Sequence, residues 1–239
     1  MHGPTILCLC VFFSIVMVPS RGEACGLTPP IGPNGLPAVC HGDPDALRIR
    51  AGLTAGGTST RLDFSDDSAD LLQSATTATL DVFLLQRLAL SATLGAALVG
   101  RIDYQGERYT LLPGPVAGLG VSYRLFGGRV PFVHASFTAS VAKATTRADD
   151  GGEADFTSRD WRLGLAVGQA LGKWAAPFAV ARYFGAGTHW DVAGGKGADA
   201  FRYQIGVGGA FGISEHWDAL VELAFLGERR VTAGVGYLF

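Results

Sequence analysis

The chain has 239 residues, of which 48% are apolar and 17% charged, and this composition excludes an intrinsically disordered protein. Thirty-four glycines without a Gly-X-Y period exclude collagen and favour many tight turns or closely packed strands. A formal charge of −2 offers no basic surface to nucleic acid. Beyond residue 20, no apolar run approaches the roughly 18 residues of a membrane-spanning helix.

The N-terminal segment has the features of an export signal. Residues 5–18 are almost entirely apolar, and the small residues Gly22 and Ala24 follow at the spacing of a signal-peptidase site. We therefore predict a signal peptide over residues 1–24, cleaved after Ala24. A short membrane anchor and lipoprotein processing at Cys25 are the alternatives.

Two cysteines follow in a Pro/Gly-rich arm over residues 25–45. In an exported protein, Cys25 and Cys40 predict a disulfide, because thiols outside the cytoplasm are oxidised. Closing this short loop stabilises the arm by about 3 kcal/mol in the chain-entropy model. A metal site lacks ligands there, since His41 alone does not complete a coordination sphere.

From residue 46 to residue 239 the chain repeats one pattern ten times. Each segment has an apolar residue at every second position and a small or polar residue between, and this period of two is typical of β-strands. The repeats predict an all-β domain over residues 46–239. The ten segments centre on residues 47–53, 77–84, 88–98, 118–125, 133–141, 161–168, 179–183, 202–211, 219–225 and 231–239.

Short and longer connections alternate between these segments. A soluble sandwich gives no reason for this order, whereas a membrane barrel has short turns on one side, longer loops on the other and an even number of strands. We predict a transmembrane antiparallel up-and-down β-barrel of ten strands, or of eight if the first or ninth segment does not pair. The longer polar connections are expected at residues 58–74, 101–112, 144–158 and 188–199.

The two faces of the segments differ in charge. The apolar face carries no charged residue, so we expect it to meet lipid while the opposite face lines the lumen. A periplasmic barrel with its apolar face inside is the alternative. The predicted lumen charges are Arg48 and a network of Arg50, Asp81, Arg124, Arg162, Arg182, Arg202 and Glu222.

These lumen charges allow two interpretations of the interior. Arginine-rich walls are compatible with an anion-favouring pore, or with a salt-bridged interior that blocks the narrow lumen of a ten-stranded barrel. We favour the blocked lumen, and expect Asp81 and Glu222 each to pair with one of Arg50, Arg124, Arg182 and Arg202. Gly236 is predicted to be a lumen position that tolerates a small polar side chain.

The last strand resembles the C-terminal signature of bacterial outer-membrane barrels, with Val235, Tyr237 and the final Phe239 alternating. Residues 120–133 are similar to a strand-turn-strand repeat of small OmpA-like and opacity-like barrels, and the similarity concerns the barrel domain alone. The resemblance implies a Gram-negative outer membrane, contact with its lipid and lipopolysaccharide, and recognition of the last strand by the barrel-assembly machinery.

Enzyme motifs are weak. The sequence contains no G-x-S-x-G, Walker A, H-E-x-x-H or C-x-x-C pattern, and we predict no cofactor and no metal. His134 and Ser136 share one strand face, as in the His-x-Ser pair of lipid A deacylases, and His189 with Asp191 resembles omptin protease residues. We predict a non-enzymatic structural or surface-interaction protein, with a small-solute channel and then these enzymes as alternatives.

Overall fold

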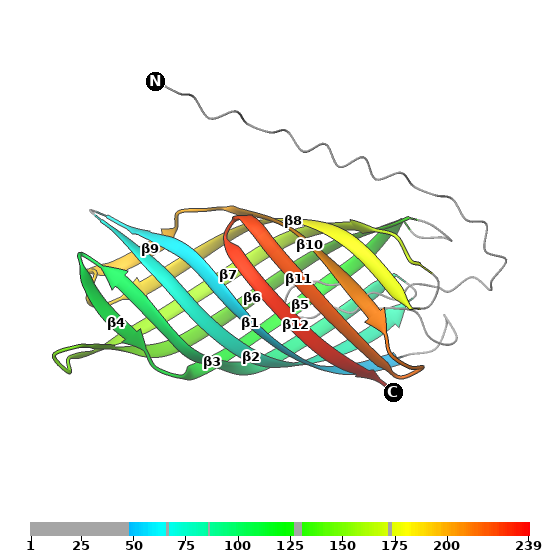
Figure 1. Cartoon of the computed structure of the whole chain (residues 1–239), viewed down its shortest axis with the longest axis horizontal. Helices are drawn as coiled ribbons and strands as arrows, with labels where there is room; N and C mark the ends of the chain where they lie inside the picture. Colours follow the sequence, from blue (N-terminus) through cyan, green and yellow to red (C-terminus); the bar gives the residue numbers. More distant parts are fainter. Residues whose placement is uncertain (1–47, 66, 86, 127–130, 172–173) are drawn as a thin grey trace, which may run out of the picture.

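The structure is a computed structural model that describes residues 48–65, 67–85, 87–126, 131–171 and 174–239 (Figure 1). The predicted signal peptide, the arm over residues 25–45, and Cys25 and Cys40 lie outside the described residues. None of the residues described forms a helix long and apolar enough to cross a membrane.

The described chain is all-β and antiparallel. Its strands are β1 (Arg48–Phe64), β2 (Ser68–Leu85), β3 (Leu88–Tyr104), β4 (Glu107–Leu111), β5 (Gly114–Phe126), β6 (Phe132–Ala148), β7 (Glu153–Gly168), β8 (Ala175–Trp190), β9 (Gly195–Asp199), β10 (Tyr203–Gly212), β11 (Trp217–Gly227) and β12 (Arg229–Leu238). The predicted fold class is therefore confirmed.

The sheet closes into a barrel because β1 pairs with β12, with Ala51 opposite Tyr237. We call the end that holds residues 48 and 239 the near end and the opposite end the far end (Figure 1). Among the described strands, the near part is a ring of ten, from β1 through β2, β3, β5, β6, β7, β8, β10 and β11 to β12.

The far part is a ring of eight, because the β11–β12 hairpin ends partway along the wall. Beyond its tip β9 replaces it and pairs directly with β1, with Leu62 opposite Asp199. In the same region β4 stands between β3 and β6. The predicted ten strands are thus present in the near part, where the first and the ninth predicted segments both pair, so the condition for the eight-stranded alternative is not met. The eight strands of the far part include β4 and β9, which lie in segments predicted to be loops.

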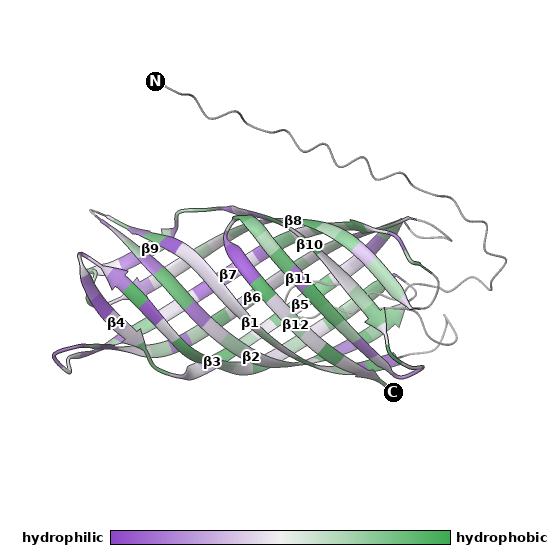
Figure 2. Ribbon diagram, in the orientation of Figure 1, coloured by the Kyte–Doolittle hydropathy of each residue, from purple (hydrophilic) through white to green (hydrophobic). Residues whose placement is uncertain are grey.

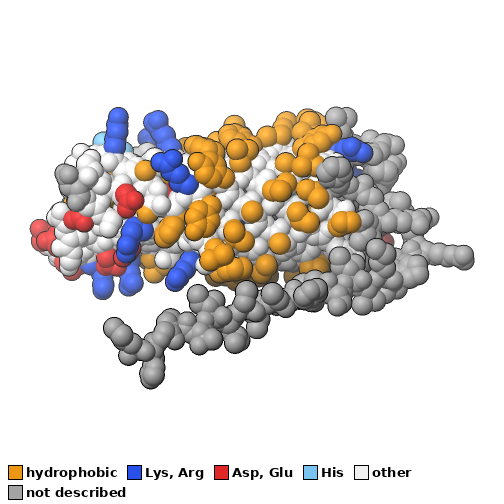
Figure 3. Space-filling model, turned by 90° about the horizontal axis from the view of Figure 1, so that it is seen from above, with side chains coloured by type: hydrophobic (Ala, Val, Ile, Leu, Met, Phe, Trp, Pro, Cys, Tyr) orange, Lys and Arg blue, Asp and Glu red, His pale blue; other side chains and the backbone are white. Residues whose placement is uncertain are grey.

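The alternation of the sequence decides which side chains point outward in the near part. Leu53, Leu94 and Leu119 point outward and are 57%, 68% and 70% exposed, whereas the intervening residues face the lumen and are buried. Hydrophobic side chains form a broad band over this part of the surface (Figure 3). Burying these leucines against lipid removes apolar surface from water, which is what makes such a face favourable in a membrane.

The pattern inverts toward the far end, where hydrophilic residues become frequent along the strands (Figure 2) and charged side chains lie on the surface (Figure 3). On β1 the outward row ends in Arg61 and Asp63, while the inward row ends in Leu62 and Phe64, which are 2% and 7% exposed. The far end is therefore built like a water-soluble barrel, with an apolar interior and charges outside.

This inversion corrects the prediction of four long polar loops. The segments expected as loops are extensions of the strands, and the turns between them are short, at residues 65–67, 105–106, 149–152 and 191–194. At the β3–β4 turn both central residues, Gln105 and Gly106, have positive φ angles of 51° and 82°. This geometry matches the twist of the flanking strands and makes a tight hairpin.

Candidate functional site: the barrel lumen

Residues from three strands form an ion-pair cluster in the lumen, close to the near end. Arg50 on β1 donates to Asp81 on β2 at 3.0 Å and forms two hydrogen bonds to Asp218 on β11, at 2.8 and 2.5 Å. Arg50 is 2% exposed and Asp81 0%. Because hydrogen bonds between charged groups are the strong ones, this cluster ties the first two strands to the C-terminal hairpin across the closing seam.

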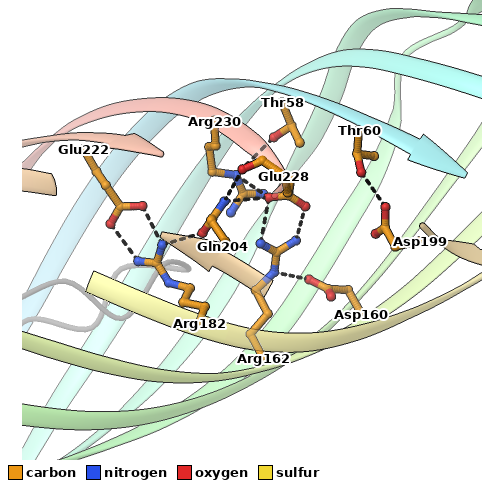
Figure 4. Close-up of polar contacts among 10 residues, drawn as sticks. All are labelled: Thr58, Thr60, Asp160, Arg162, Arg182, Asp199, Gln204, Glu222, Glu228 and Arg230. Carbon is orange, nitrogen blue, oxygen red and sulfur yellow. Dashed lines mark hydrogen bonds and ion pairs between the residues drawn. The ribbon is translucent and has the colours of Figure 1, made fainter. Parts of the chain in front are cut away.

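A second cluster lies further along the lumen, on β8, β10 and β11 (Figure 4). Arg182 forms two 2.6 Å hydrogen bonds to the carboxylate of Glu222, which is completely buried. The same guanidinium donates to the side-chain oxygen of Gln204 at 2.7 Å. Asp81 and Glu222 thus each lie against an arginine of the predicted set, Arg50 and Arg182 respectively.

Gln204 links this cluster to Glu228 at the tip of the β11–β12 hairpin. Its amide nitrogen donates to Glu228 Oε1 at 2.9 Å. Glu228 also accepts two 2.8 Å hydrogen bonds from Arg162, which in turn pairs with Asp160. The hairpin tip turns through Gly227, whose φ of 74° favours glycine, and so aims a carboxylate into the lumen rather than into solvent (Figure 4).

A cavity of about 160 Å³ adjoins this network, and Asp160, Arg162 and Glu228 are among the residues that line it. Its lining includes hydroxyl side chains such as Thr58, Thr60 and Thr188, together with glycines and alanines. Thr60 donates to Asp199 at 2.5 Å on its wall. The volume is comparable to that of cavities that hold one small organic molecule, and this polar lining suits a few waters instead.

An apolar core closes the far side of the cavity. Trp190 is completely buried there, packs edge-on against Tyr109 at a centroid distance of 5.0 Å, and donates its indole N–H to Thr146 at 2.9 Å. We call this cluster the far-end core; its buried members are Leu62, Phe64, Ala69, Leu71, Ile102, Tyr109, Leu111, Phe156 and Trp190.

Tyr109 joins the far-end core to the outer surface. Its hydroxyl donates to Glu107 Oε2 at 2.8 Å. This hydrogen bond, followed by burial, raises the pKa of Tyr109 to about 12. The phenol therefore stays neutral across the physiological range.

The structure distributes the remaining predicted lumen residues unevenly. Arg48 and Arg124 are buried at the near end, each 6% exposed. Arg202, in contrast, is exposed on the outer surface. The prediction for Arg202 fails because the chain leaves the strand pattern between β9 and β10, so that counting alternate positions back from β10 gives the wrong face.

Several members of the network are not among the residues predicted from the sequence. For some of them the sequence contains a signal, and for others it does not. Asp218 and Asp160 lie on the charged face of their strands, so extending the count of alternate positions would have found them. Glu228 and Arg230 lie at the hairpin tip, which an alternating pattern treats as a turn. Gln204 carries no charge, so the charge pattern does not single it out as a partner.

The two candidate enzyme pairs are not assembled as catalytic groups in the described residues. His134 is 3% exposed, and neither of its ring nitrogens has a hydrogen-bond partner there, so it is not bonded to Ser136. His189 and Asp191 lie 3.3 Å apart with side chains 58% and 59% exposed. A base and nucleophile need a hydrogen bond and a shielded site, and neither pair has both.

The C-terminal strand closes the barrel. The backbone N–H of Phe239 donates to the carbonyl of Ile49 at 2.9 Å, and the ring of Phe239 packs edge-on against Tyr237 at 5.0 Å. Tyr237 also contacts Trp217 on β11. The rings of Trp217, Tyr237 and Phe239 thus form an aromatic cluster at the near end of the seam.

No protein-family model matches the chain, and no curated protein does. Among solved structures, it is similar to the translocator domain of the autotransporter NalP from Neisseria meningitidis, with a TM-score of 0.46 and 14% identity over 80% of this chain and 88% of that one. The transport unit of AIDA-I from Escherichia coli gives 0.44 and 13%, covering 80% and 89%. The outer membrane protein OprG from Pseudomonas aeruginosa gives 0.39 and 12%, covering 82% and 96%.

Proposed function

We propose that this chain is a non-enzymatic barrel of a Gram-negative outer membrane that does not conduct solutes and serves a structural or surface-interaction role. The uncharged apolar band around its near part supports the membrane location, because only lipid provides a partner for so much exposed leucine and valine. The far end, polar outside, then stands in the aqueous phase beyond the membrane.

The proposal that the lumen is closed rests on the burial of the charged side chains that line it. Arg50, Arg162, Arg182, Glu222 and Glu228 are each at most 7% exposed. In a water-filled pore of this kind, charged wall residues keep contact with solvent. The far-end core adds a second, apolar layer across the same path, with Trp190 fully buried.

Planar-bilayer recording of the refolded barrel tests this function. We expect the unaltered protein to give no steady conductance at a concentration where a porin conducts. A double variant, Arg162→Ala with Glu228→Ala, removes both partners of the central ion pair. We expect this variant to open the lumen, and it is compared with the unaltered protein. Heat-modifiable migration in gels, which reports a folded barrel, must be shown for both proteins.

The recording also decides between the proposed role and the channel alternative. Steady, anion-selective conductance of the unaltered barrel would overturn the closed lumen and establish the small-solute channel. A silent barrel that hydrolyses lipid A or peptide substrates would instead revive the enzyme alternatives.

A further inference from the structure

An open groove of about 840 Å³ crosses the outer face of the barrel over β5, β6, β7, β8 and β9. The surface is hollowed there because small residues point outward, among them Ala139, Gly185 and Gly187. Trp161 lies over Gly185 on the neighbouring strand, where a side-chain carbon would come within 2.7 Å of the indole nitrogen. The indole therefore lies flat along the wall and forms one side of the groove.

The groove runs from the apolar band toward the far end, where its lining includes charged residues of both signs. The carboxylates of Asp160 and Asp199 are bonded to Arg162 and Thr60 of the lumen, so the arginines are the charged groups open to the outer face. Trp161 and Tyr183, which contact each other edge to face at 5.8 Å, belong to the aromatic residues of the lipid-facing surface. Arg159, the next outward residue beyond Trp161, and Arg202 also line the groove. Such an order of apolar, aromatic and cationic side chains matches the order of acyl chain, interface and headgroup in a lipid.

These two arginines differ from most of their neighbours on the outer surface. Arg61, Arg108 and Arg147 are each paired with a carboxylate, at 3.0, 3.1 and 2.6 Å. Arg159 and Arg202 are exposed, and within the described part of the chain neither is in an ion pair. Two guanidiniums without an ion-pair partner at the mouth of an apolar groove favour an anionic group there, and phosphate is an anion that guanidinium binds through two parallel hydrogen bonds.

A third cation widens this basic edge. Lys143 points outward on β6, one outward position beyond Val141, which lies opposite Arg159. Lys143, Arg159 and Arg202 therefore extend from β6 to the segment between β9 and β10, where the carbonyl of Arg202 accepts a hydrogen bond from β8. Across the strands this is three interstrand spacings, or about 14 Å. This width exceeds what a single phosphodiester needs and fits a lipid with two separated phosphate groups.

We propose that the groove binds a phosphorylated, multiply acylated glycolipid of the lipid A type, with an acyl chain along Trp161 and phosphates on Arg159 and Arg202. The inference rests on the proposed outer-membrane location and deepens it by naming the lipid and its site. The arginines hold the phosphates by charge-assisted hydrogen bonds, while the small residues let the chain lie close to the backbone.

Binding of purified lipid A to the delipidated, refolded barrel in neutral detergent tests the site, with native mass spectrometry as the readout. Arg159→Gln with Arg202→Gln should weaken binding about tenfold or more, because each lost bond involves a charged donor. Gly187→Leu should weaken it as well by filling the groove; a side-chain carbon at Gly187 meets nothing within 4 Å, so the barrel itself is not disturbed.

Matched controls lie on another part of the outer face. Gly57→Leu adds the same side chain on β1, where the nearest atom is a backbone oxygen at 3.9 Å, and Arg61→Gln removes an arginine outside the groove. Both should bind lipid A as the unaltered barrel does. Equal weakening in the controls would overturn the assignment of the site.

The choice of lipid probe distinguishes the remaining outcomes. Dephosphorylated lipid A should bind at least tenfold more weakly than lipid A, and equal binding would overturn the role of the arginines. Phosphatidylglycerol binding as tightly as lipid A would overturn the choice of a glycolipid. No lipid binding by a barrel that is nonetheless folded and localised to the outer membrane would reject this inference and leave the proposed function standing.

Discussion

Removing the carboxylate of Glu228 should destabilise the barrel far more than removing an exposed carboxylate with the same kind of partner. In Glu228→Gln the side chain keeps its size but loses its charge, and only one acceptor oxygen remains for the two 2.8 Å bonds from Arg162. Arg162 keeps its second carboxylate partner, Asp160. Breaking a buried ion pair from one side costs about 3–5 kcal/mol, since the remaining charge stays desolvated. Glu228 is 2% exposed and Arg162 7%, so this buried-pair range applies, at its lower end because Asp160 still neutralises part of the charge of Arg162.

Glu153→Gln is the control for this experiment. Glu153 pairs with Arg147 at 2.6 Å on the outer surface, and the two side chains are 51% and 52% exposed. Exposed pairs of this kind contribute about 0–1 kcal/mol. The free energy of unfolding of both variants in lipid vesicles, from urea titration followed by tryptophan fluorescence, measures the difference. Equal losses, or a loss below about 1 kcal/mol for Glu228→Gln, would refute the reasoning that burial sets the cost.

Three further predictions follow from other parts of the barrel. Val235→Arg, on the lipid face, should lower the free energy of unfolding in vesicles by about 2–4 kcal/mol if this position lies near the bilayer midplane, whereas Val235→Leu should change it little. Tyr109 should remain protonated near pH 11, because its pKa of about 12 lies above that of a free phenol; tyrosinate absorbance would show one residue titrating late, and stability should fall as pH rises from about 10 to about 12. Phe239→Ser should block outer-membrane assembly without blocking export, which cell fractionation measures, and a normal heat-modifiable barrel in that strain would contradict it.

Much of the barrel follows from the sequence because a period of two is continuous and each face is consistent over most of a strand. Arg50, Asp81, Arg182 and Glu222 occupy the inward face that alternation assigned to them. What alternation does not contain is the level at which the environment changes from lipid to water. The inversion on β1 is visible in the sequence as Leu62 between Arg61 and Asp63. Because the sequence does not show where lipid ends and water begins, this charged stretch predicted a loop.

Other features depend on contacts between strands that no single strand encodes. Gly236 faces the lumen as predicted, but a side-chain carbon there would overlap the guanidinium of Arg50, so a small polar residue at this position requires Arg50 to shift. The glycine is needed because Arg50 crosses over β12 to reach Asp218. Glu228 likewise gains its role from a hairpin that stops within the wall, a length that depends on β9 taking its place.

The change from ten strands to eight gives β1 two successive partners along its length. Its first half pairs with β12, from Arg50 opposite Leu238 to Ser59 opposite Arg229, and its end pairs with β9. Pairing with β12 alone therefore does not complete the seam, because Leu62 and Phe64 have their partners on this edge of β1 in β9. A strand that takes the place of β12, whether added at the C-terminus or supplied by another molecule, can pair only with the near part of β1. The far part is closed by β9, which lies inside the sequence. Different strands therefore close the two ends of the barrel.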